Sequence, residues 1–141
     1  MRLEPFRATD LQRFSNYGGQ DWMAPTFEAE SFGLVEKQGG AFSAEHEGQF
    51  LGVGGLLHHS DFRATAWCVL NRTDPKNFLL IHRVVSTHLN RQKYRRIDAI
   101  VDLEFEDGLR WVRLLGFVLE VTYKPFCMPD GRPASEWVRL R

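Results

Sequence analysis

The sequence has little cysteine, no excess of charge of either sign and no long hydrophobic run. Two of its 141 residues are cysteines, too few for a disulfide framework, so we expect a reduced, intracellular protein. Lysine plus arginine and aspartate plus glutamate both number 18, so no bulk charge draws the chain to nucleic acid or to an anionic membrane. The first residues lack the apolar region of a signal peptide, and no stretch is long enough to span a bilayer. These features predict a soluble protein with neither a nucleic-acid nor a membrane partner.

Large apolar and aromatic side chains dominate what the chain does contain. It is 43% hydrophobic, with 11 phenylalanines and 4 tryptophans, enough for a core built on large rings. A length of 141 residues is typical of one domain. We therefore expect a single domain over residues 1–141. A net charge of zero removes repulsion between copies, which favours contacts with other protein chains.

Periodicity and turn residues predict alternating strands and helices. Strands are expected at Leu3–Phe6, Ala41–His46, Gln49–Leu57, Ala64–Leu70, Ile97–Val101, Phe117–Tyr123 and Ser135–Leu140. Helices are expected from a capping box at Thr9–Gln12 to about Phe14, from Pro75 to about Asn90 and from Leu103 to Leu115, and Asp21–Phe32 is compatible with a helix interrupted near Pro25. This order predicts an α/β (α+β) fold with a mixed, mostly antiparallel sheet of six or seven strands and helices on both faces.

Several local features make this prediction more specific. Three glycines within one strand, at positions 52, 54 and 55, indicate a bulge or a close backbone approach. Asp74 is suited to cap a helix that has Pro75 at its first position, and the Asp74 carboxylate is expected to accept from the N–H of Lys76 or Asn77. The side chains expected to be buried together are Trp67, Leu70, Ile81, Val85, Ile97, Ile100, Leu114 and Phe117.

Three segments, taken in order, carry a resemblance that covers nearly the whole chain. They are the opening Leu3–Leu11, the glycine-rich Gly48–Leu56, and Trp111–Phe117, which ends in Leu-Gly-Phe. Together they resemble the GNAT fold of N-acetyltransferases. Within that superfamily the chain looks most like short GNAT-like proteins encoded by tailed phages, because the Leu-Gly-Phe segment is followed by a Pro-Asp-Gly turn at Pro129–Gly131.

The resemblance implies that acetyl-CoA lies where Ala64–Leu70 and Ile97–Val101 splay apart. Its diphosphate would lie on the loop Arg72–Asn77, where small residues normally let backbone N–H groups approach phosphate. Here Pro75 and Asn77 replace those small residues, and the carboxylate of Asp74 repels an anion. The candidate cofactor residues are Val69, Leu70, Arg72, Lys76 and Asn77.

The residues that would move protons also depart from the family pattern. Where many members carry an asparagine and a general-acid tyrosine, this chain has Phe105 and Val112, and neither can donate a proton. His58, His59 and Asp61 are the candidates for a general base, and a solvated polar loop is the alternative interpretation.

Two other clusters of polar residues give weaker indications of a binding site. The histidine pair and Asp61 lack a second group of ligands at metal-binding spacing, so we expect no metal. The basic run Arg91–Arg96 could grip phosphates, but acidic residues follow it closely, so a solvated loop is the better interpretation.

Two functions follow from this pattern. The first is an acetyl-CoA-dependent N-acyltransferase that relies on substrate proximity and on a backbone oxyanion contact near Val69. The second is a non-catalytic protein with the same fold, such as a phage virion or morphogenesis component that binds other chains. The altered loop, the missing tyrosine and the zero net charge favour the second function, and acetyl-CoA binding stays an open question.

Overall fold

The computed structural model describes residues 1–15 and 31–141. Its elements are β1 (Arg2–Pro5), the 3-10 helix η1 (Ala8–Arg13), α1 (Ser31–Gln38), β2 (Ala41–His46), β3 (Gln49–His58), β4 (Arg63–Leu70), α2 (Pro75–Asn90), β5 (Arg96–Asp102), α3 (Glu106–Leu114), β6 (Val118–Lys124) and β7 (Ala134–Leu140). All seven predicted strands are present, with ends shifted by a residue or two. The helix considered for Asp21–Phe32 falls outside the described residues except for its last two positions, where α1 begins.

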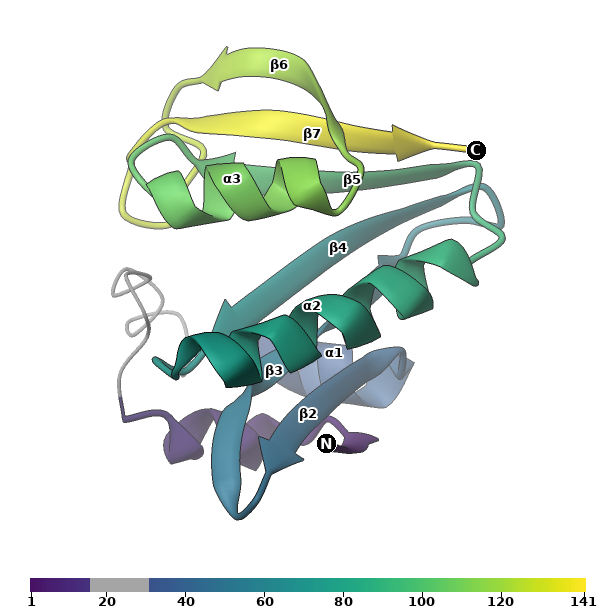
Figure 1. Ribbon diagram of the computed structural model, residues 1–141. Helices are drawn as coiled ribbons and strands as arrows, with labels where there is room; N and C mark the ends of the chain where they lie inside the picture. The colour runs from purple at the N-terminus through teal and green to yellow at the C-terminus, as the bar shows by residue number, and fades with distance from the viewer. Residues whose placement is uncertain (16–30) are drawn as a thin grey trace.

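The strands form one seven-stranded sheet in the order β1-β2-β3-β4-β5-β7-β6. Every neighbouring pair is antiparallel except β4 with β5. In Figure 1, α2 and α3 lie in front of the sheet and α1 lies behind it, so helices cover both faces. The predicted α+β architecture with a mixed, mostly antiparallel sheet is confirmed.

The parallel pair β4 and β5 is the feature that creates space in the sheet. Its register has three pairs, from Arg63 opposite Arg96 to Thr65 opposite Asp98. Beyond these pairs the two strands diverge (Figure 1), and α2 is the crossover that joins them. The prediction of neighbouring parallel strands with this crossover helix is confirmed. Among the described residues, no strand pairs beyond Thr65 with the edge of β4 that faces β5.

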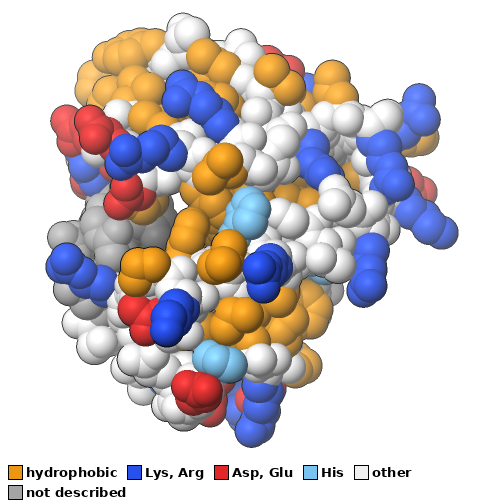
Figure 2. Space-filling model, in the orientation of Figure 1, with side chains coloured by type: hydrophobic (Ala, Val, Ile, Leu, Met, Phe, Trp, Pro, Cys, Tyr) orange, Lys and Arg blue, Asp and Glu red, His pale blue; other side chains and the backbone are white. Residues whose placement is uncertain are grey.

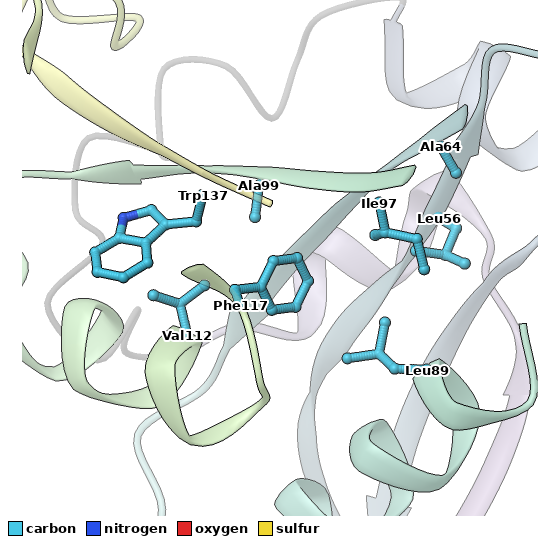
Figure 3. Close-up of a cluster of buried hydrophobic side chains, with 8 residues drawn as sticks. All are labelled: Leu56, Ala64, Leu89, Ile97, Ala99, Val112, Phe117 and Trp137. Carbon is cyan, nitrogen blue, oxygen red and sulfur yellow. The ribbon is translucent and has the colours of Figure 1, made fainter. Parts of the chain in front are cut away.

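The main core lies between the sheet and the two front helices. Figure 3 shows Leu89 of α2 and Val112 of α3 facing Ile97, Ala99 and Trp137 of the sheet. The other members of this cluster are Leu56, Ala64 and Phe117. A second cluster, of Phe6, Leu11, Ala41, Phe50, Val53 and Val69, fills the opposite face beneath η1 and α1.

The predicted core is confirmed only in part. Ile81, Ile97 and Phe117 are buried, whereas Trp67, Leu70, Val85 and Ile100 are only half-buried. Trp67 also packs against the second cluster, on the opposite face of the sheet, and so is not buried together with the others. Leu114, however, is 70% exposed. The buried side of α3 contains Val112, with Leu109 and Leu115 packed against the same cluster, and a residue two positions from Val112 faces the other way on a helix. The assignment of Leu114 to the core is therefore wrong.

The glycines of β3 allow close backbone approach, as predicted. A Cβ atom at Gly55 would lie 2.3 Å from the carbonyl oxygen of Gly40, and one at Gly54 would lie 2.9 Å from that of Trp67. Strand β3 can therefore carry no side chain at these positions without moving a neighbouring strand. The predicted irregularity is also present, as a register shift between Ala44 and Glu45 of β2.

The first helical segment differs from its prediction. It is a 3-10 helix whose cap position is Arg7, and the Asp10 carboxylate accepts from the Arg7 backbone N–H at 2.9 Å. Asp10 also accepts from the Ser43 hydroxyl at 2.6 Å. This tie to β2 moves the start two residues before the Thr9 cap that the sequence suggested. Helix α3 likewise begins at Glu106 and not at Leu103.

Within residues 1–15 and 31–141, no helix has both the length and the apolar composition needed to cross a bilayer.

Candidate functional site

A cavity of about 970 Å³ lies where β4 and β5 diverge. Its lining includes Leu70 of β4, Ile100 of β5, Phe78 of α2 and Trp111 of α3. The walls are therefore mostly apolar, and they come from both sides of the split in the sheet. In Figure 2, hydrophobic side chains also reach the surface in the centre of this face. Such a cleft suits a long, flexible ligand with an apolar or amide-containing arm.

An aromatic contact joins the two helices over the cleft. The rings of Phe78 and Trp111 meet edge to face with centroids 5.4 Å apart. The indole N–H of Trp111 donates to Nδ1 of His82 at 3.1 Å. His82 is thus a half-buried, hydrogen-bonded histidine.

The wide end of the cleft lies next to the loop that begins α2. Asp74 caps this helix, and its carboxylate accepts from the Asn77 N–H at 2.9 Å. This confirms the predicted cap. Asn77 is buried, and its side-chain amide donates to Gln49 at 2.8 Å and to the Thr73 hydroxyl at 3.1 Å. The Asn77 N–H at the helix N-terminus is therefore already paired with a group of the chain itself.

The candidate cofactor residues lie in two different environments. Leu70 and Arg72 line the cavity, and Arg72 is exposed. The side chain of Val69 is buried in the second core cluster, on the other face of the sheet, so only its backbone could meet a ligand. Lys76 is exposed but does not line the cavity, and Asn77 holds the loop together.

The two family positions on α3 are occupied by apolar side chains with structural roles. The ring of Phe105 packs over Gly108, where a Cβ atom would lie 2.5 Å from it. Val112 is buried in the main core. Neither residue can donate a proton to a leaving thiolate, and Trp111, which does line the cavity, is already donating to His82.

The three candidate bases lie at the opposite, narrow end of β4. His58 is exposed, and its Nδ1 lies 2.7 Å from the Tyr94 hydroxyl. His59 is also exposed, and its Nε2 lies 2.7 Å from the Thr65 hydroxyl. Asp61 is exposed and has no hydrogen-bond or ion-pair partner among the described residues. The structure therefore separates these residues from the α2 loop by the length of β4, about 23 Å.

Beside His59 lies a buried carboxylate that the sequence analysis did not select. Asp98 is 2% exposed, and it accepts from the Thr65 hydroxyl at 2.6 Å and from Arg63 Nε at 2.7 Å. Burial alone would raise the pKa of Asp98, but the bonds from Arg63 and Thr65 outweigh it and hold that pKa below its usual range. Arg96, from the basic run, also contacts Asp98 and pairs with Glu120.

The polar residues within apolar strands were the signal that could have revealed this network. Thr65 interrupts the run Ala64–Leu70, and Asp98 lies inside the predicted buried strand Ile97–Val101. A buried charge normally has partners. Among the described residues, no group of three or more histidine, cysteine, aspartate or glutamate side chains is arranged to hold a metal ion.

The thiol of Cys68, which lines the cavity, leads to a prediction about reactivity. Burial raises the pKa of the Cys68 thiol to about 12. Because a raised pKa leaves only ~10⁻⁴ of the thiol ionised at pH 8, we expect Cys68 to resist iodoacetamide in the native protein and to react after unfolding. Mass spectrometry of the native and unfolded proteins, with Cys127→Ser as control, measures this. Equal labelling of Cys68 in both states would contradict it.

Solved structures with the same architecture identify the fold. No family model and no curated protein matches the sequence. The chain has the GNAT fold, and solved structures match it over almost their full length. Ard1 from Thermoplasma volcanium matches with a TM-score of 0.74 at 14% identity, over 99% of this chain and 96% of that one. A GNAT-family acetyltransferase from Bacillus anthracis matches with 0.65 at 18%, over 99% and 95%. An aminoglycoside 6'-acetyltransferase type Ii matches with 0.65 at 15%, over 99% and 97%.

Proposed function

We propose that this chain is an N-acyltransferase that takes the acyl-pantetheine arm of a thioester into the cleft between β4 and β5. The observation that carries the proposal is the divergence of these strands after Thr65 and Asp98, together with the cavity of about 970 Å³ that it opens. Two of the matching structures, the aminoglycoside 6'-acetyltransferase and the GNAT-family acetyltransferase from Bacillus anthracis, are acetyltransferases, which supports the same activity. The acceptor in this proposal is an amine, and the product is an amide.

The residues of the chain fit the arm of coenzyme A better than its diphosphate. The apolar cleft suits the arm, and the edge of β4 beyond Thr65 has backbone groups to offer it. At the α2 loop, by contrast, the Asp74 carboxylate occupies the Asn77 N–H, and Pro75 has no N–H to offer. We therefore expect the diphosphate to add little affinity, because the exposed Arg72 and Lys76 are its remaining cationic partners on this loop.

Calorimetric titration with two donors tests this function. We expect S-acetyl-pantetheine and acetyl-CoA to bind with dissociation constants within about threefold of each other, which is a difference of about 0.65 kcal/mol. Much tighter binding of acetyl-CoA would show that the loop anchors the diphosphate despite its cap. If neither donor bound, the acyltransferase proposal would be lost.

The non-catalytic alternative rests on a different observation. Large apolar side chains are exposed along β6 and the loop after it, where Figure 2 shows hydrophobic groups at the top of the molecule. They are Val118, Leu119, Tyr123 and Phe126. A patch of this kind suits contacts with other protein chains, as in a homo-oligomer or a phage virion. Failure of both donors in the titration would favour this function.

A further inference from the structure

Three polar side chains form a hydrogen-bonded chain at the narrow end of the cleft. Nε2 of His59 lies 2.7 Å from the Thr65 hydroxyl, and that hydroxyl lies 2.6 Å from Oδ1 of Asp98. The other oxygen of Asp98 accepts from Arg63 Nε at 2.7 Å. The chain thus runs from an exposed imidazole to a buried carboxylate whose charge is compensated by arginine.

The direction of these bonds follows from the chemistry of the groups. An ionised carboxylate can only accept, so the single hydroxyl proton of Thr65 is donated to Asp98. The Thr65 oxygen must then accept from His59, which fixes the ring proton of neutral His59 on Nε2. Nδ1 keeps its lone pair, and it has no hydrogen-bond partner among the described residues.

The position of these three hydrogen-bonded side chains relates them to the cleft. Thr65 and Asp98 face each other as the last pair of the parallel ladder, so they stand where β4 and β5 begin to diverge. The next residue on each strand, Ala66 and Ala99, lines the cavity. Because side chains alternate along a strand, and Ala64 and Ile97 face the helices, Thr65 and Asp98 point to the opposite face. This face of the sheet is the one that α2 and α3 do not cover.

The backbone of the β3–β4 connection holds His59 in place. Its N–H donates to the Arg63 carbonyl at 3.0 Å, and the Ser60 hydroxyl accepts from the Arg63 N–H at 3.2 Å. The ring is therefore fixed both through its backbone and through Nε2. A fixed imidazole with a free lone pair has the properties of a general base.

We propose that His59 is the general base of the acyl transfer and that Thr65 and Asp98 are positioning residues that orient it. This inference rests on the proposed acyltransferase function. Nδ1 of His59 removes one proton from the acceptor ammonium and releases it to solvent, and the freed lone pair attacks the thioester carbon. The C–N bond forms, the C–S bond breaks, and the thiol leaves with the second amine proton.

The other two candidates from the sequence lack this arrangement. Nδ1 of His58 is engaged by Tyr94, which packs against the main core, so His58 lies on the helix-covered face. Asp61 is exposed and has no partner among the described residues to orient it. Asp61→Asn is therefore a matched control from the same loop.

The first test reads the hydrogen-bonded chain without any substrate. In the NMR spectrum of the 141-residue protein, we expect the proton on His59 Nε2 to be observable, because its bond to Thr65 slows exchange with water. Thr65→Val should remove this signal, and Thr65→Ser should restore it, since serine keeps the hydroxyl. Asp61→Asn should retain it. Absence of the signal from the unmodified protein and from Thr65→Ser alike would overturn the arrangement.

The second test separates a base from a merely structural residue. Acetyl transfer is followed from S-acetyl-pantetheine to butylamine, which is protonated at neutral pH, and to methoxyamine, which is already neutral. We expect His59→Ala to lower kcat ~10²–10⁴-fold with butylamine and to change it little with methoxyamine. Thr65→Val should give a smaller loss in the same pattern, on the order of tenfold. Asp61→Asn should behave as the unmodified protein.

Each outcome distinguishes this inference from the function on which it rests. Equal losses of kcat with both amines in His59→Ala would contradict the role of His59 as the base but not the acyltransferase function. If the donor binds but neither amine is acetylated faster than in buffer, the role of His59 as the base is likewise contradicted. If the donor does not bind at all, the proposed function fails together with the role of His59, whatever the NMR signal shows.

Discussion

Phe117→Ala is expected to lower the free energy of unfolding by about 3–5 kcal/mol. The ring is 6% exposed, and it packs in the main core with Val112, Trp137 and Leu89 (Figure 3). It follows Gly116, whose positive φ of 89° ends α3 and turns the chain into β6. Because backbone on both sides is fixed, we expect the core to collapse poorly around the missing ring. Urea denaturation of the two proteins measures the loss.

Leu114→Ala is the matched control for this change. Leu114 lies three residues earlier and is 70% exposed, so its truncation should change the free energy of unfolding by about 0.5 kcal/mol or less. Comparable losses for the two variants would mean that the orientation of α3 described above is wrong.

Replacing Asp74 and Pro75 together by glycine is expected to raise the affinity for acetyl-CoA on the order of tenfold, or about 1.4 kcal/mol. The change removes a carboxylate from the N-terminus of α2 and adds a backbone N–H at position 75. It should leave the affinity for S-acetyl-pantetheine unchanged, because that donor has no diphosphate. Parallel titrations with both donors measure the effect.

The same double change carries a cost in stability. We expect the free energy of unfolding to fall by about 2 kcal/mol, because a helix cap and a preorganised first turn are lost. Asp74→Ser is the matched control, since serine caps a helix as well as aspartate but has no charge. It should preserve stability and give part of the gain in affinity. An equal gain for both donors would show that the loop acts through the cleft and not through phosphate.

The helix boundaries of α2 were predictable because local chemistry determines them. Asp74 and Pro75 start the helix where the sequence placed them, and Asn90 ends it. The phase of α3 was predicted less well, because a nine-residue helix with leucines on more than one side has no unique apolar stripe. The packing of Val112 against β5 and β7 decided it, and that packing depends on the whole sheet.

The candidate site was predictable at its wide end and not at its narrow end. The cap at Asp74 is a local feature, and its consequence for phosphate binding followed from the sequence. The pairing of Thr65 with Asp98 depends on the register between strands whose residues are 33 positions apart. Nothing in either strand alone indicates that register. The histidine next to this pair could therefore be proposed as a base, but its partners could not.

The short parallel ladder also has a consequence for how the molecule comes apart. Three register pairs join β1–β4 to β5–β7 within the sheet, so few backbone bonds resist separation of the two halves. Side chains supply the remaining cohesion, because Leu56 and Ala64 from one half share a cluster with Ile97 and Trp137 from the other. When this side-chain cluster loosens, the two halves open locally as separate cooperative units. Amide exchange near the seam between β4 and β5 is then set by side-chain packing more than by the hydrogen bonds of the ladder itself.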